Sequence, residues 1–188
     1  MNINIQEERL LIISDLHIGN PYSLAKEGLA DFLNYAFENR YSVVINGDGF
    51  EILQASFTDL LADSLDVLKY FSRLMNEGLR LYYVVGNHDI PLEHVLESSL
   101  VSYIVPFLNV RSGRRRIRVE HGHVYDPFFV KHPDVYHAVT VLAGALLTVQ
   151  PDSYRLWSRY QAFKDRVSQR RRRDDHLPPS VYYDAAEM

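Results

Sequence analysis

The chain has 188 residues, of which 47% are hydrophobic and 23% are charged, and its formal net charge at pH 7 is −4. These values are typical of one folded domain with a buried core and exclude wholesale disorder, and the acidic balance disfavours nucleic acid as a partner. Because the chain contains no cysteine, disulfides, zinc-thiolate sites and cysteine nucleophiles are excluded.

Neither a signal peptide nor a membrane span is predicted. Residues 1–14 lack a basic section followed by an apolar core and a cleavage site. The longest apolar run, residues 139–149, is shorter than the ~20 residues that a transmembrane helix needs. We therefore expect a cytoplasmic protein, with peripheral contact to the inner membrane as a further expectation from its C-terminal third.

Short apolar runs alternate with helical patterns in the first half of the chain. Residues 10–14, 43–46 and 81–85 are predicted to be strands covered on both faces. Residues 29–37 and 61–75 carry apolar side chains at helical spacing. This order predicts an α/β fold with a parallel sheet. Right-handed crossovers would bring the C-terminal ends of the strands to one edge, where ligands bind in such sheets.

The pattern changes after residue 87. Residues 104–110 are predicted to form a strand, and Ser112-Gly113 a turn into a half-buried hairpin strand at 116–120. From Pro133 onward the pattern is helical, with an apolar helix around 139–149 and an amphipathic one at 154–167. A basic run at Arg170–Arg173 and the chain-breaking pair Pro178-Pro179 follow.

Four polar clusters follow the ends of predicted strands. They are Asp15-Leu16-His17, Gly47-Asp48-Gly49, Gly86-Asn87-His88-Asp89 and Glu120-His121-Gly122-His123. Each aspartate or asparagine could by itself be a turn or capping residue, and a single histidine is often structural. Turns do not require histidine, however, so the four clusters together predict a metal site. Oxygen and nitrogen ligands of this kind suit manganese, iron or zinc better than calcium.

The spacing within the clusters suggests how two divalent ions would be held. Residues two apart on an extended segment point the same way, so Asp15 and His17 are predicted to bind one ion together. Asp48 is predicted to bridge the ions, with Asn87 and His121 serving the second. Two ions about 3.5–4 Å apart can hold a hydroxide and clamp the oxygens of an in-line displacement at phosphorus.

His88 and Asp89 are the predicted catalytic residues. His88 directly follows Asn87 and cannot easily face the same way. We interpret it as a proton donor to the leaving oxygen, or as a cation that faces the phosphoryl charge. Asp89 is predicted to orient it, and His123 to support His121 rather than to bind metal.

The motifs in residues 10–125 resemble those of the calcineurin-like metallophosphoesterases. They are Ser14-Asp15-Leu16-His17-Ile18-Gly19, Asn46-Gly47-Asp48-Gly49-Phe50-Glu51, Gly86-Asn87-His88-Asp89 and Glu120-His121-Gly122-His123. Within this superfamily the first two are similar to the UDP-2,3-diacylglucosamine pyrophosphatase group of lipid A synthesis. The resemblance implies a four-layer αββα sandwich and a dimanganese-type site, with five metal ligands: Asp15, His17, Asp48, Asn87 and His121.

The chain departs from that group at three places. His88 stands where arginine is usual, and His123 stands where aspartate is usual. The Gly-His-x-His block that gives each ion one more ligand in the family does not follow downstream. We therefore expect an incomplete core: residues 1–130 as its N-terminal portion, 131–177 as a helical lid-like segment, and 178–188 as the start of a truncated return.

The predicted function is metal-dependent hydrolysis of a phosphoester or pyrophosphate bond, on a UDP-linked acylated sugar. Apolar side chains at 139–147 could line an acyl-chain groove, and Arg170–Arg173 could attract anionic headgroups. Alternatively, the apolar helix packs on the core and the arginines are simply solvated. Two other functions stay open: the same chemistry on a nucleotide, nucleic acid or phosphoprotein, and a non-catalytic scaffold that lacks the last ligand block.

Overall fold

The computed structural model describes residues 3–94, 101–149 and 159. Its strands are β1 (Ile3–Gln6), β2 (Leu10–Ile13), β3 (Ser42–Asn46), β4 (Leu81–Val84), β5 (Tyr103–Val105), β6 (Phe107–Ser112) and β7 (Arg115–Glu120). Its α-helices are α1 (Lys26–Glu38), α2 (Phe57–Asn76), α3 (Pro127–Lys131) and α4 (Pro133–Val149), and its 3-10 helices are η1 (Ile90–His94) and η2 (Gly122–Tyr125).

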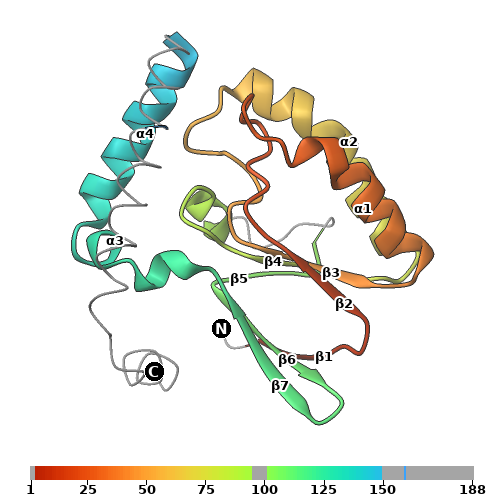
Figure 1. Ribbon diagram of the computed structural model, residues 1–188. Coiled ribbons are helices and arrows are strands. Elements are labelled where there is room, and N and C mark those ends of the chain that lie inside the picture. The colour runs from red at the N-terminus through yellow and green to blue at the C-terminus, as the bar shows by residue number, and fades with distance from the viewer. Residues whose placement is uncertain (1–2, 95–100, 150–158, 160–188) are drawn as a thin grey trace.

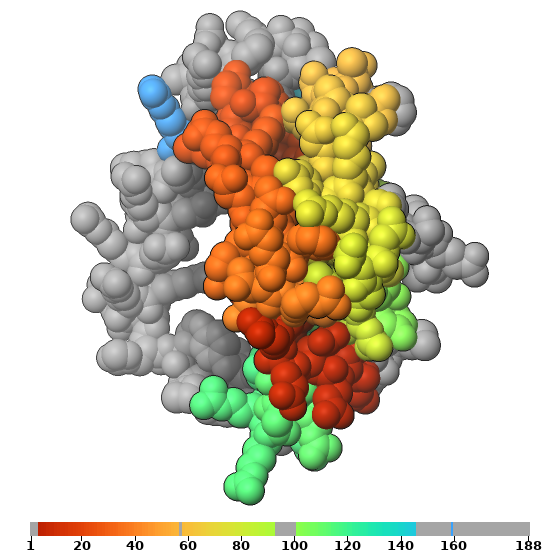
Figure 2. Space-filling view, turned by 90° about the vertical axis from the view of Figure 1, so that its right-hand side faces the viewer, coloured from red at the N-terminus to blue at the C-terminus, as the bar shows by residue number. Residues whose placement is uncertain are grey.

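These elements form two sheets and a helical layer. The four-stranded sheet has the order β2-β3-β4-β5, and all of its strands are parallel. The three-stranded sheet has the order β1-β6-β7, in which β6 is parallel to β1 and antiparallel to β7. Helices α1 and α2 cover one face of the four-stranded sheet, and the smaller sheet lies across the other (Figure 1). Figure 2 shows the two helices side by side over that face. The predicted α/β sandwich is therefore confirmed, with three of its four layers in the described part of the chain.

Residues 43–45 of β3 and the whole of β4 are hydrophobic because both faces of these strands are buried. Val43 and Ile45 face α1 and α2, whereas Val44 and Val84 face the smaller sheet. Each such side chain is at most 1% exposed. Burying a valine or isoleucine fully contributes about 1.5–3 kcal/mol relative to leaving it in water. The core thus lies on both faces of β3 and β4 and holds these strands, and the loops that follow them, in place.

The predicted strand over 104–110 is in fact two strands in different sheets. β5 ends at Val105 in the four-stranded sheet, and β6 begins at Phe107 in the smaller one. Pro106 lies between them, and proline has no backbone N–H to donate to a ladder. The break therefore occurs where the chain passes from one sheet to the other. The short strand β1 was not predicted from the sequence.

The predicted hairpin and the first predicted C-terminal helix are confirmed. β6 and β7 join at a turn in which Gly113 has a φ of 57°, and α4 includes the apolar run from residue 139 to residue 149. The predicted helix at 154–167 falls almost entirely outside the described residues, as do Arg170–Arg173, Pro178-Pro179 and the predicted return at 178–188. In the described part of the chain no helix is both long and apolar enough to span a membrane.

Candidate metal centre

The loops that follow β2, β3 and β4 are joined by backbone hydrogen bonds at one edge of the sheet. Asp15 N donates to Gly47 O at 3.1 Å, and His17 N donates to Asp48 O at 2.9 Å. Gly47 N in turn donates to Val84 O at 2.8 Å. Residues separated by more than 30 positions are thus held within one continuous backbone network, so the first three predicted clusters do meet.

Three predicted ligands have an unusual backbone conformation. Asp15, His17 and Asp48 have φ angles of 56°, 46° and 52°. Positive φ is uncommon for residues other than glycine and costs about 1–3 kcal/mol, so it persists where the surrounding structure enforces it, often at functional sites. The segment from Asp15 to His17 is therefore not extended, and the geometric reason for placing both side chains on one ion was wrong.

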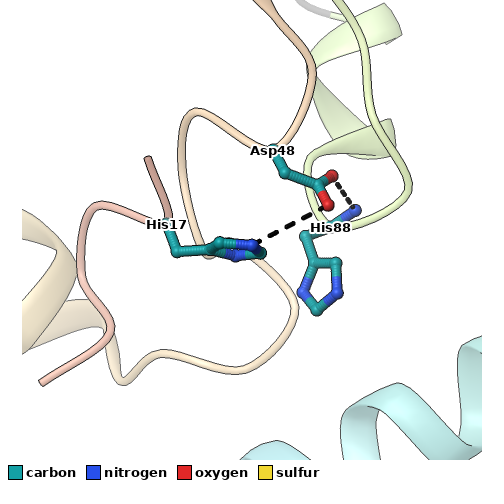
Figure 3. A group of neighbouring side chains, drawn as sticks. All are labelled: His17, Asp48 and His88. Carbon is teal, nitrogen blue, oxygen red and sulfur yellow. Dashed lines mark hydrogen bonds and ion pairs between the residues drawn. The ribbon is translucent and has the colours of Figure 1, made fainter. Parts of the chain in front are cut away.

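The side chains form two clusters that share Asp48. The first contains Asp15, Asp48 and His121, and the second contains His17, Asp48 and His88; in each, one potential ligand atom per residue lies within 4.8 Å of the others. His121 Nε2 is 3.8 Å from both Asp15 Oδ1 and Asp48 Oδ2. His17 Nε2 is 4.0 Å from Asp48 Oδ2 (Figure 3). Asp15 and His17 thus belong to different clusters, and Asp48 is the residue that the two clusters share.

Two glycines allow this close approach. A Cβ atom on Gly47 would lie 2.3 Å from the His121 ring, and one on Gly86 would lie 2.2 Å from Asp48 Oδ1. Real Cβ atoms essentially never come this close to other heavy atoms. Gly47 and Gly86 are therefore required by side-chain proximity as well as by turning of the chain.

Asn87 is buried beside these clusters and contacts the helical segment. Its side chain amide Nδ2 donates to Tyr136 Oη on α4 at 2.8 Å, and the residue is 7% exposed. Its Oδ1 accepts no hydrogen bond from the described residues. The next residue, His88, donates its backbone N–H to Asp48 Oδ1 at 2.9 Å.

Glu51 is a site residue that sequence reasoning left without a role. It is fully buried, and its carboxylate accepts hydrogen bonds from His17 Nδ1 at 2.8 Å and from His88 Nδ1 at 2.5 Å. With Nδ1 of both rings bonded to Glu51, the Nε2 atoms face away from it. The sequence feature that could have indicated this role is a carboxylate three positions after Asp48, in the loop that follows β3.

Asp89 does not orient His88, in contrast to the prediction. Its carboxylate accepts hydrogen bonds from Tyr83 Oη, from Gly49 N at 2.9 Å and from Gly86 N at 2.6 Å. These donors belong to β4 and to the loops after β3 and β4. Asp89 therefore ties the loops of the site together, while Glu51 takes the orienting role.

Burial and neighbouring charged groups shift the pKa values of several site residues. Burial acts to lower the pKa of His17, but its hydrogen bond to Glu51 and the nearby carboxylates outweigh this and raise the pKa. Burial acts to raise the pKa of Glu51, and hydrogen bonds from His17 and His88 outweigh it and lower the pKa. For Asp89 burial dominates and raises the pKa.

His123 supports His121 through a short contact. Their Nδ1 atoms are 2.9 Å apart, so one ring must donate to the other. Burial, followed by the neighbouring His121, lowers the pKa of His123 to about 4, which leaves it neutral at pH 7. His121 can then donate from Nδ1 to His123 while its Nε2 faces Asp15 and Asp48.

The charges of the site fit a divalent cation. Asp48 is 4% exposed, and in the described part of the chain no lysine or arginine pairs with Asp15, Asp48, Glu51 or Asp89. A buried carboxylate without a full counter-charge is costly. Gaps of 3.8–4.0 Å between Asp48 Oδ2 and two imidazole nitrogens are too long for hydrogen bonds. They leave room for an ion with bonds of about 2 Å to each atom.

The sequence model of the family described as calcineurin-like phosphoesterase matches residues 8–185. The chain belongs to the calcineurin-like phosphoesterases. The family consists of hydrolases that act on phosphoester bonds with divalent metal ions, as the motifs predicted.

Other comparisons add little about this phosphoesterase. No curated protein matches the chain significantly. A crystal structure of a protein of unknown function from Aquifex aeolicus is 19% identical, with 76% of this chain and 73% of that chain covered and a TM-score of 0.43. A similarity this low does not bear on substrate or mechanism.

Proposed function

We propose that this phosphoesterase binds two divalent cations, one at each of the two clusters that share Asp48. Asp15 and His121 would hold one ion and His17 the other, with Asp48 shared and the Asn87 amide oxygen as a further ligand. The observation that carries this proposal is the pair of clusters that share Asp48. The mixed oxygen and nitrogen donors favour manganese, with iron and zinc as alternatives.

The chain's own residues would complete the chemistry. When bound, the cations supply Lewis acidity, which acidifies water and stabilises phosphoryl charge. His88 is bonded to Glu51 through Nδ1, so its Nε2 is left to donate a proton to the leaving oxygen or to face the phosphoryl group. Since His88 also lies within ligand distance of His17 and Asp48, metal binding by His88 is the competing role.

For the substrate we keep the nucleotide-linked acylated sugar that the motifs suggest. The support is α4, whose Tyr136 contacts Asn87 at the site. On the same helix Val135, Val139 and Leu142 are 50%, 38% and 61% exposed and follow one another at helical spacing. An exposed apolar stripe beside a phosphoesterase site suits an acyl chain. A nucleotide phosphodiester without acyl chains is the alternative.

Chelator-treated protein with added Mn²⁺ provides the test. We expect hydrolysis of bis(p-nitrophenyl) phosphate, and faster hydrolysis of a UDP-linked diacylated sugar than of the same molecule without acyl chains. Asp48→Asn should lose both Mn²⁺ binding by calorimetry and activity. Asp66→Asn, which removes an 81%-exposed carboxylate on α2, should lose neither.

Each part of the proposal has its own contrary result. Unchanged Mn²⁺ affinity in Asp48→Asn would overturn the shared-ligand arrangement. Equal rates with and without acyl chains would overturn the lipid substrate and leave the nucleotide alternative.

A further inference from the structure

Tyr136 connects α4 to one of the predicted metal ligands, Asn87. It lies near the start of α4, where its backbone N–H donates to His132 O at 2.9 Å. Its ring meets Phe129 of α3 edge to face, with centroids 5.1 Å apart and planes at 84°. The ring is thus held by the helix and by a neighbouring aromatic side chain, and its hydroxyl reaches Asn87 Nδ2 at 2.8 Å.

An asparagine amide can face a cation with either end, and only the oxygen is a ligand. A tyrosine hydroxyl can accept from the amide nitrogen or donate to the amide oxygen. Once Asn87 Oδ1 is directed at a cation, Tyr136 can only accept from Nδ2. The hydroxyl hydrogen is then free of Asn87, and among the described residues no other acceptor is bonded to it.

We propose that Tyr136 is a positioning residue that orients the Asn87 amide with its oxygen toward the cation. Its own hydroxyl then donates a hydrogen bond to a phosphoryl oxygen of the substrate. This inference rests on the proposed two-cation site. It gives the helical segment a direct part in recognising phosphate, in addition to covering the site. Loss of the hydroxyl would then weaken the binding of both metal and phosphate.

The hydroxyl is not needed to hold α4 in place. The buried face of the helix includes Thr140 and Ala143. Gly144 packs so tightly that a Cβ there would lie 2.5 Å from Gln54 Cα in the loop after β3. Tyr136→Phe keeps the ring and its contact with Phe129, so it removes the hydrogen bonds and leaves the packing.

Calorimetry with Mn²⁺ alone, and then with inorganic phosphate on the Mn²⁺-loaded protein, measures the two roles separately. Residues that orient metal ligands typically change metal affinity by about 10–100-fold. We therefore expect Tyr136→Phe to weaken Mn²⁺ binding about 10-fold and to weaken phosphate binding as well. The matched control is Tyr35→Phe, a 53%-exposed tyrosine of α1, which should change neither affinity.

A double-mutant cycle with Asn87→Asp distinguishes positioning from packing. Aspartate presents an oxygen in either orientation, so Tyr136→Phe should no longer weaken Mn²⁺ binding in that background. Because a carboxylate only accepts, the Tyr136 hydroxyl would donate to it rather than to phosphate, so Tyr136→Phe should no longer weaken phosphate binding either, whereas a packing role would leave both effects in place. Equal Mn²⁺ and phosphate affinities for Tyr136→Phe and wild type would overturn the inference. If in that case Asp48→Asn still loses Mn²⁺ binding, the proposed two-cation site stands and only the role of Tyr136 is wrong. If the wild-type protein binds no Mn²⁺, both the proposed site and the role of Tyr136 are wrong.

Discussion

His17 and His88 are bonded through Nδ1 to the same buried carboxylate, that of Glu51, at 2.8 and 2.5 Å. Their rings stand at 90° with centroids 4.9 Å apart. One residue therefore sets the orientation of a predicted metal ligand and of the predicted proton donor together.

Replacing Glu51 should consequently impair metal binding and turnover at once. In Glu51→Gln only one side chain oxygen accepts, and the amide nitrogen faces a donor, so at least one imidazole loses its orientation. We expect kcat to fall about 10–100-fold and Mn²⁺ affinity to weaken. Steady-state kinetics and calorimetry check this, with the exposed Glu77→Gln as the control. A change in kcat with normal Mn²⁺ affinity would show that Glu51 serves His88 alone.

Asp89 should matter more for stability than for chemistry on the folded enzyme. Its carboxylate accepts from three donors, one of them the hydroxyl of buried Tyr83. Asp89→Asn places an amide N–H against a donor, and we expect it to cost about 1–3 kcal/mol of unfolding free energy in urea titrations. Tyr83→Phe should cost less, because two backbone donors remain. An Asp89→Asn protein of normal stability but low kcat would return Asp89 to the orienting role.

Gly86→Ala should disturb the site directly. The new Cβ would meet Asp48 Oδ1 at 2.2 Å and Asp48 N at 2.4 Å, and the backbone atom cannot be avoided by a rotamer change. We expect weaker Mn²⁺ binding and a lower Tm. Gly28→Ala is the matched control, since a Cβ at this position in α1 meets nothing within 4 Å. It should stabilise the protein by about 0.5–1 kcal/mol. Normal Mn²⁺ affinity in Gly86→Ala would contradict the tight packing around Asp48.

The stability of the metal-free protein should depend on the neutrality of His123. Burial and His121 lower its pKa from 6.5 to about 4 in the folded state. Between these pH values the unfolded chain binds a proton and the folded chain does not. The contribution is therefore fully present above pH 6.5 and is lost as the pH falls toward 4. Urea titrations in chelator at several pH values should show a shallower decline for His123→Gln than for wild type. Parallel declines would mean that His123 is protonated alike in both states.

The sequence by itself determined the sheet, its two helices and the presence of a metal-type site. Runs such as residues 43–45 are apolar because both faces of a central parallel strand are buried, and this pattern is local. Polar clusters at successive strand ends must also meet, because parallel strands end at one edge. Asp48 as the residue common to both clusters could therefore be predicted from its two carboxylate oxygens and its place at a strand end.

Only the tertiary structure decided how the site residues divide and what holds them. Asp15 and His17 have a left-handed backbone and belong to different clusters around Asp48, and no local pattern in the sequence predicts that conformation. The partners of His88, Asn87 and Asp89 lie 37, 49 and 6 positions away along the chain. Such pairings depend on how loops and α4 pack in three dimensions, which hydrophobic periodicity does not encode.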